Sequence, residues 1–513
     1  MKKASNFWYL LSAILIGLIL VIAGCSGEKG ATADKKTLIY ATASDATRLD
    51  PQMMTDIPSF NPMYAKVYQP LILLDKDGKL QPLLATEWKN INATTWEFKL
   101  RKEVKFHDGT PFNAAAVKKS FDRLADEKNK KANRIYLENL KEVKIIDDYT
   151  IQIITKAPMP ALLQNLSHIS TSIISPKAID ESETKSLDQN PVGTGPFKLE
   201  KWTKGESMTL VAAPGYWGKK PAIEKIVFKV APEDTTRMGM VQRNEAQIAD
   251  KVPFNDVDRY TKEGKFAIIR TPGNGTEFIG LNLKKEKFQD LRVRTAIDMS
   301  IDRKALLGAV FQGVGLPGIS TLGPKVFGYN PNLTAPEYNP TKAKELLKEA
   351  GVPNLNIVLW TSTNNKARLK MAEIIQAQLK DAGITVEIKT LEWGVFLDAH
   401  HKGETEMYIM GWGNTSGDAG TAFVPVWSKE GFGNSNGSFY SKPEVESLFA
   451  QAAIEMDVEK RKALYQQAQQ IIAADEVRFV VRVNEYVSLA NKNIKGIAFT
   501  PSELLLIDDL VIE

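Results

Sequence analysis

The chain has 513 residues, of which 43% are hydrophobic and 25% are charged. These fractions are typical of a folded protein and exclude a disordered chain. The 66 Lys and Arg against 61 Asp and Glu give a formal net charge of +5, without the concentrated basic excess of nucleic-acid binders. One cysteine excludes intramolecular disulfides and cysteine-based metal clusters, and four histidines leave little room for a multi-histidine metal centre. We therefore expect no cofactor and no resident metal.

The first 24 residues have the pattern of a cleaved secretory leader. Two early lysines precede an almost unbroken apolar run over residues 7–22, which ends in small residues before the only cysteine, Cys25. The sequence IAGC resembles the lipobox of bacterial lipoproteins, which implies lipidation of Cys25; a plain N-terminal membrane anchor is the alternative. Residues 25–36 are short, polar and without apolar periodicity, so we expect a flexible tether. In both cases the body of the protein lies outside the cytoplasmic membrane.

The N-terminal half is predicted to combine short strands with a helix. Apolar or alternating patterns predict strands over residues 37–42, 96–100 and 149–154. Asn113 is expected to be the N-cap of the helix that follows it. The glycine- and proline-rich residues 191–196 predict a sharp turn of the chain, without the Lys-Ser/Thr of a phosphate-binding loop.

The C-terminal half contains a predicted βαβ unit. Residues 356–388 read as a strand, an amphipathic helix over residues 366–382, and a second strand, and a further apolar strand follows at 407–411. Ligands of open parallel sheets bind at the carboxyl ends of the strands. The loops at residues 361–365 and 412–418 are expected at one such edge.

Charges of both signs are expected at that edge. Lys366 and Arg368 lie in the first helical turn, where backbone N–H groups also favour an anion, whereas Asp418 favours a cation. The pattern predicts a site for a zwitterionic ligand.

Five longer segments occur in the order found in a known family: residues 100–123, 190–202, 288–303, 338–351 and 411–423. On these segments the chain resembles the extracellular solute-binding proteins of oligopeptide and dipeptide ABC importers (family 5). Within that family the last segment, GWGNTSGDAGTAF, is most similar to glutathione-binding receptors.

The resemblance implies an α/β fold, a two-lobed clamshell of the periplasmic-binding-protein type II class with an extra α/β subdomain on the N-terminal lobe. We place the N-terminal lobe at residues 37–68, 190–270 and 485–513. The inserted subdomain is expected at residues 69–189 and the C-terminal lobe at 271–484.

The resemblance also implies a function. The expected protein is a monomeric, lipid-anchored receptor on the extracellular face of the bacterial cytoplasmic membrane, without enzymatic activity. It would capture glutathione or a di- or tripeptide by closure of the lobes and deliver it to an ABC permease. A receptor for a metal chelate or haem is the alternative within the family. A secreted peptidase is an alternative of another class, although the chain lacks the H-E-x-x-H motif.

The resemblance identifies Asp418 with an aspartate that holds the amino group of the peptide in dipeptide receptors. We expect Asp418 to be hydrated in the empty protein, because an unpaired buried charge is costly; capping of a turn is the structural alternative. His400 and His401 are expected on a solvated helix face rather than at a metal. The other candidate ligand-binding residues are Trp412, Asn414, Thr415, Ser416, Gly417, Arg368, Asp45, Thr47 and Arg134.

Overall fold

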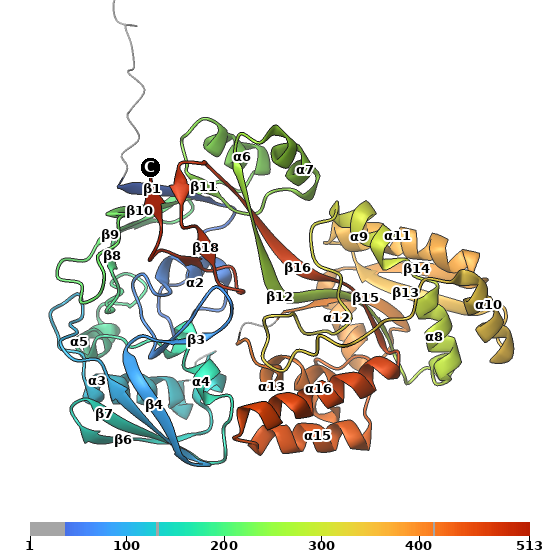
Figure 1. Cartoon of the computed structure of the whole chain (residues 1–513), viewed down its shortest axis with the longest axis horizontal. Helices are drawn as coiled ribbons and strands as arrows, with labels where there is room; N and C mark the ends of the chain where they lie inside the picture. The colour runs from blue at the N-terminus through green and yellow to red at the C-terminus, as the bar shows by residue number, and fades with distance from the viewer. Residues whose placement is uncertain (1–35, 130–132, 414–415) are drawn as a thin grey trace, which may run out of the picture.

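A computed structural model describes residues 36–129, 133–413 and 416–513, and it shows two lobes side by side (Figure 1). One ten-stranded sheet runs through both lobes in the order β14-β13-β15-β12-β16-β11-β1-β10-β9-β8. Its longest strands, β12 (Ala267–Leu281) and β16 (Arg478–Ala490), are antiparallel neighbours that cross from one lobe to the other. These two strands form the hinge region of the molecule.

The N-terminal part of this sheet is built on β1 (Thr37–Thr42), which confirms the first predicted strand. It pairs in parallel with β10 (Lys225–Val230) and β11 (Ile248–Ala249). The remaining elements of this part are β8 (Phe197–Thr203), β9 (Ser207–Ala212), α2 (Ile57–Met63), α6 (Asp234–Gln242) and α7 (Phe254–Glu263).

A separate four-stranded antiparallel sheet has the order β4-β5-β7-β6. It contains both other predicted strands of this half of the chain, and Asn113 accepts a hydrogen bond from the Ala116 amide as the N-cap of α3, as predicted. The elements of this region are β2 (Ile72–Leu74), β3 (Leu80–Pro82), β4 (Ala85–Asn92), β5 (Thr95–Leu100), α3 (Ala114–Ala125), β6 (Leu140–Asp147), β7 (Thr150–Thr155), α4 (Leu162–Asn165) and α5 (Pro176–Asp180).

The predicted glycine turn packs against the backbone of a distant segment. A Cβ atom on Gly193 would lie 2.0 Å from the Val67 carbonyl oxygen, and one on Gly195 would lie 2.1 Å from the Lys66 carbonyl oxygen. Only glycine permits this approach. The turn therefore fixes the segment after α2 against the start of β8.

The other lobe confirms the predicted βαβ unit. Parallel strands β13 (Asn356–Ser362) and β14 (Thr385–Leu391) are joined by α11 (Lys366–Asp381), and β15 (Met407–Trp412) is parallel to β13 on its other side. The helices of this lobe are α8 (Leu291–Met299), α9 (Arg303–Phe311), α10 (Pro340–Glu349), α11, α12 (Trp393–Lys402), α13 (Ala419–Ala422), α14 (Val424–Trp427), α15 (Pro443–Ile454) and α16 (Val458–Ala474). Within the described ranges, no helix is both long and apolar enough to span a membrane.

The C-terminal segment returns to the N-terminal lobe as two short strand pairs. Strands β17 (Ile494–Lys495) and β20 (Val511–Ile512) form one, and β18 (Ala498–Phe499) and β19 (Leu505–Leu506) form the other. The buried Lys66 ammonium donates hydrogen bonds to the carbonyl oxygens of Leu505 and Asn61, at 2.7 and 2.8 Å. Burial lowers the pKa of Lys66 to about 7. This lysine holds the β18–β19 hairpin against α2.

Candidate functional site

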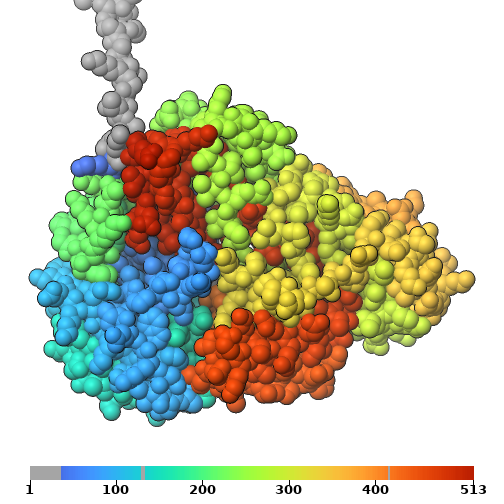
Figure 2. All heavy atoms as spheres, viewed as in Figure 1, coloured from blue at the N-terminus to red at the C-terminus, as the bar shows by residue number. Residues whose placement is uncertain are grey.

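A cavity of about 380 Å³ lies beside the crossing strand β16. In Figure 2 the dark-red crossing segment is visible at the bottom of a hollow between green and yellow surfaces. The volume falls within the roughly 300–1,000 Å³ that is common for small-molecule sites. Its lining comes from the segment after β11, from β16 and from the β18–β19 hairpin, and includes Lys251, Arg482, Asn484, Tyr486 and Glu503.

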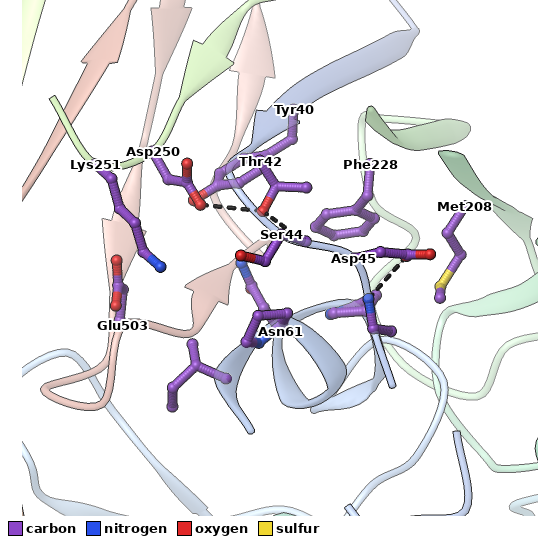
Figure 3. Close-up of a pocket in the computed structure, with 14 residues that line it drawn as sticks. Tyr40, Thr42, Ser44, Asp45, Asn61, Met208, Phe228, Asp250, Lys251 and Glu503 are labelled. Carbon is purple, nitrogen blue, oxygen red and sulfur yellow. Dashed lines mark hydrogen bonds between the residues drawn. The ribbon is translucent and has the colours of Figure 1, made fainter. Parts of the chain in front are cut away.

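A second, smaller cavity shares two of these residues, Lys251 and Glu503, and is enclosed by the N-terminal lobe (Figure 3). Its other lining residues include Asp45 and Thr42 from the segment that begins with β1, and Asp250 at the end of β11. The two cavities therefore meet at a pair of oppositely charged side chains.

Glu503 lies in the loop of the β18–β19 hairpin, with its carboxylate in the second cavity. Burial, together with the negative charge of Asp250, raises the pKa of this carboxyl to about 7, whereas the positive charge of Lys251 lowers it. Glu503 is thus a carboxylate that a ligand cation would stabilise in its ionised form.

Asp250, in contrast, is already held by the protein. Its carboxylate accepts hydrogen bonds from the Thr42 hydroxyl at 3.0 Å and the Ala43 amide at 2.9 Å, and it lies 3.1 Å from Nε of buried Arg237. Burial raises the pKa of Asp250, and the charges of Arg237 and Lys251 act against this rise. Asp250 therefore contributes negative charge to the cavity, but its carboxylate oxygens already accept hydrogen bonds from the protein.

The crossing strands present buried polar atoms without a partner among the described residues. They are both amide atoms of Asn274, Oγ1 of Thr276, Nε of Arg482 and Oδ1 of Asn484. The register between β12 and β16 is interrupted from Pro272 to Thr276, which removes part of the regular backbone pairing. Since buried polar groups are normally hydrogen-bonded, the two of these residues that line the 380 Å³ cavity, Arg482 and Asn484, are suited to contact a polar ligand.

The loop after β15 lies at the carboxyl end of that strand, as the sequence predicted. Ser416 lines a small, mostly apolar cavity together with Ile169 and Ser502 of the opposite lobe. Gly417 has a positive φ of 72°, and its carbonyl oxygen accepts a hydrogen bond from the Phe327 amide at 2.9 Å. Trp412 donates from its indole nitrogen to the Ala422 carbonyl oxygen at 2.7 Å. Asn414 and Thr415 lie outside the described residues.

The expectation that Asp418 is hydrated is wrong. Its side chain is 0% exposed and is bound in a two-point ion pair by Arg461 of α16, with both N–O distances at 2.7 Å. Oδ1 also accepts the Gly420 amide at the start of α13, which is the capping role that the sequence left as an alternative. Asp418 therefore anchors the loop to the helical hairpin α15–α16, and its charge is compensated before any ligand arrives.

The remaining candidates are also engaged with neighbouring residues. Arg368 of α11 pairs with Glu277 of β12 at 3.0 Å, next to the hinge. Thr47 binds Asp56 and Ser59, and Arg134 pairs with Glu127 at 2.6 Å.

Asp45 lines the second cavity, but its carboxylate accepts hydrogen bonds from the Trp202 indole at 3.1 Å and the Gly205 amide at 2.7 Å. The structure brings Asp45 into this cavity and leaves Arg134 in the four-stranded-sheet region.

His400 is buried, which corrects the prediction of a solvated face for it. Its ring lies 4.4 Å from the Tyr408 ring and stacks on Phe396, and burial lowers its pKa to about 3. Within the described part of the chain, no group of three or more His, Cys, Asp or Glu residues is arranged to hold a metal ion.

The comparisons with known proteins agree with this architecture. A sequence model of the bacterial extracellular solute-binding proteins, family 5 (middle region), matches residues 79–434. The chain is 32% identical over 476 residues to the glutathione-binding protein GsiB of Shigella flexneri, covering 91% of this chain and 92% of that protein. The chain belongs to family 5 of the bacterial extracellular solute-binding proteins.

Two solved structures show the same two-lobed fold. HbpA2 from Haemophilus parasuis matches with a TM-score of 0.87 at 28% identity, covering 93% of this chain and 100% of that one. DppA from Helicobacter pylori, in complex with the peptide STSA, matches with a TM-score of 0.74 at 29% identity, covering 93% and 98%. The predicted fold class is confirmed, whereas the residue limits of the lobes stay predictions.

Proposed function

We propose that this family 5 receptor captures glutathione or a short peptide between its lobes and delivers it to an ABC permease. The observation that carries the proposal is the 32% identity to a glutathione-binding protein over nine-tenths of the chain. The charged cavities at the crossing strands support it, because a peptide has charged termini and polar amides along its length.

The physical basis is charge-assisted hydrogen bonding in a space from which closure removes water. Each such bond to a charged group contributes about 1.5–3 kcal/mol, roughly twice the value for neutral groups. The loop that contains Ser416 and Gly417 supplies one wall, and the β18–β19 hairpin supplies the opposite one. Binding needs no bond to be broken, in agreement with relatives that are named as binding proteins.

We further propose that Cys25 carries a lipid and that residues 25–36 tether a monomeric body to the extracellular face of the cytoplasmic membrane. Globomycin treatment of expressing cells and mass spectrometry of the mature N-terminus test this part. Processing before Cys25 with a lipid mass increment supports it, and an unmodified cysteine contradicts it.

Native mass spectrometry of the protein as purified tests the ligand class. We expect a mass increment of a di- or tripeptide, and titration calorimetry should then show one-site binding of reduced glutathione. A bound metal chelate or haem, or a peptide that the purified protein cleaves, would contradict the proposal.

A further inference from the structure

Lys251 and Glu503 lie where the two cavities meet, and they come from separate elements. Lys251 follows β11, and Glu503 lies in the β18–β19 hairpin, yet both side chains line both cavities. Figure 3 shows them at the same end of the pocket, with the Lys251 ammonium directed toward the Glu503 side chain. Among the described residues, neither makes a hydrogen bond or ion pair through its side chain, although the Lys251 charge acts on Glu503.

The other charged groups of these cavities are committed to the protein. Asp45 and Asp250 have the partners given above. Glu485 pairs with Arg270 at 2.6 Å and accepts the Gly315 amide at 3.1 Å. Arg482 donates from one terminal nitrogen to the Val314 carbonyl oxygen at 2.9 Å and lies over the Phe311 ring at 3.9 Å, while its Nε has no partner among the described residues. Asp234, which also lines the larger cavity, pairs with Arg237 at 2.5 Å. At the junction itself, which only Lys251 and Glu503 line from both cavities, a ligand therefore meets one available anion and one available cation.

An α-amino-acid head matches this arrangement, because it has an ammonium and a carboxylate on one carbon atom. An ordinary α-linked peptide separates these groups, with the ammonium at one end and the carboxylate at the other. A γ-glutamyl peptide, of which glutathione is one, keeps both on the first residue. Its head can pair with two opposite charges at once, whereas an α-linked N-terminus has no carboxylate on the carbon that carries its ammonium.

We propose that Lys251 and Glu503 form a subsite for the α-amino-acid head of γ-glutamyl peptides, with the ligand carboxylate at Lys251 and the ligand ammonium at Glu503. This inference rests on the proposed function and gives it a structural criterion for specificity. The withdrawal of Glu503 from water strengthens its attraction for the ammonium. The α-linked isomer is disfavoured because its free carboxylate lies at the end of the glutamate side chain, not on the carbon that carries the ammonium, so the two charges no longer match the spacing of the subsite.

Four S-methylated tripeptides test the subsite by titration calorimetry. They are γ-Glu-Cys-Gly, its α-linked isomer, an analogue without the amine (glutaryl-Cys-Gly) and one without the α-carboxylate (4-aminobutanoyl-Cys-Gly). The unmodified protein should bind the first at least about tenfold more tightly than each of the other three.

Two variants test which protein side chain contacts which charged group of the ligand. Glu503→Gln should weaken binding of γ-Glu-Cys-Gly about tenfold and leave the analogue without the amine unchanged. Lys251→Gln should weaken binding of γ-Glu-Cys-Gly similarly and leave the analogue without the α-carboxylate unchanged. Glu200→Gln and Lys225→Gln are matched controls, since these residues pair at 3.1 Å on an exposed part of the same lobe and line neither cavity. Thermal unfolding monitors the fold of each variant.

The outcomes separate this inference from the proposed function. Equal affinity for the γ- and α-linked tripeptides, or equal losses for all four ligands in both variants, overturns the subsite while the receptor function stands. Failure of the unmodified protein to bind any of the four overturns the subsite, and it overturns the receptor function as well when native mass spectrometry also shows no peptide increment.

Discussion

The charge state of the Glu503 side chain depends on its burial and on the charged groups beside it. In the empty protein burial raises its pKa to about 7, and the charge of Asp250 adds to this rise. Lys251 from the β11 side is the opposing cation. The phenol groups of Tyr40 on β1 and Tyr486 on β16 also face it. The group is therefore partly protonated near neutral pH until a cation binds.

Ligand affinity should consequently depend on pH. A bound ammonium favours the ionised carboxylate and lowers the pKa of Glu503, so the favourable contribution is present above about pH 7 and is lost as the pH falls through that value. Between about pH 7.5 and pH 5.5 we expect the affinity for γ-Glu-Cys-Gly to fall roughly tenfold or more.

Calorimetry at both pH values checks this, and Glu503→Gln should remove most of the dependence. The glutaryl analogue, which has no ammonium, is the matched ligand control. If the affinity of Glu503→Gln for γ-Glu-Cys-Gly still depended fully on pH, a group other than Glu503 would be responsible for the pH dependence.

At the scale of an element, a buried ion pair fixes the loop between β15 and α13. The loop between β15 and α13 ends at Asp418, which Arg461 of α16 holds from behind, and the Tyr465 hydroxyl accepts from the same guanidinium at 3.1 Å. Because Asp418 and Arg461 are 0% and 4% exposed, loss of one partner leaves a buried charge without compensation.

Asp418→Asn should therefore lower the free energy of unfolding by about 3–5 kcal/mol. Chemical denaturation measures this loss. Asp398→Asn is the matched control, since Asp398 forms an exposed pair with Lys402 at 2.6 Å and should change stability by less than about 1 kcal/mol. Equal stability of the two variants would show that the buried pair does not anchor the loop.

Periodic elements could be predicted from the sequence, and long-range pairings could not. The strand of β1 and the helix α11 were predicted because alternation and apolar spacing are local properties. The partner of Asp418 lies 43 residues away on a helix whose pattern contains no signal for it. Glu503 was missed because a polar residue in a hairpin loop is typical of a solvent-exposed turn. Its burial results from the return of the chain end to the N-terminal lobe.

At the scale of the whole molecule, the lobes touch away from the crossing strands. Asp77, in the loop between β2 and β3, pairs with Lys325 of the opposite lobe at 2.9 Å. A Cβ on the adjacent Gly78 would lie 3.0 Å from the Lys325 carbonyl oxygen, so the backbones of the two lobes are also close here. In Figure 2 the blue N-terminal surface meets the yellow segment of the other lobe. This contact is expected to favour closure before ligand binds.

Asp77→Asn should shift the empty protein toward a more open form, with a larger radius of gyration in small-angle scattering. The same shift is expected in the unmodified protein when ionic strength rises from about 0.05 to 0.5 M, because salt screens exposed charges. Hydrogen bonds from Lys76 and Lys325 lower the pKa of Asp77 to about 2, so the contact should not respond to pH between about 5 and 8.

Lys76→Gln is the matched control, because Lys76 also pairs with Asp77, at 2.8 Å, but belongs to the same loop. It should leave the lobe opening nearly unchanged. Saturating ligand should restore the closed form in Asp77→Asn, at an affinity reduced only by the fraction of molecules that had opened. Identical scattering of the variant and the unmodified protein at low salt would mean that closure depends on the crossing strands alone.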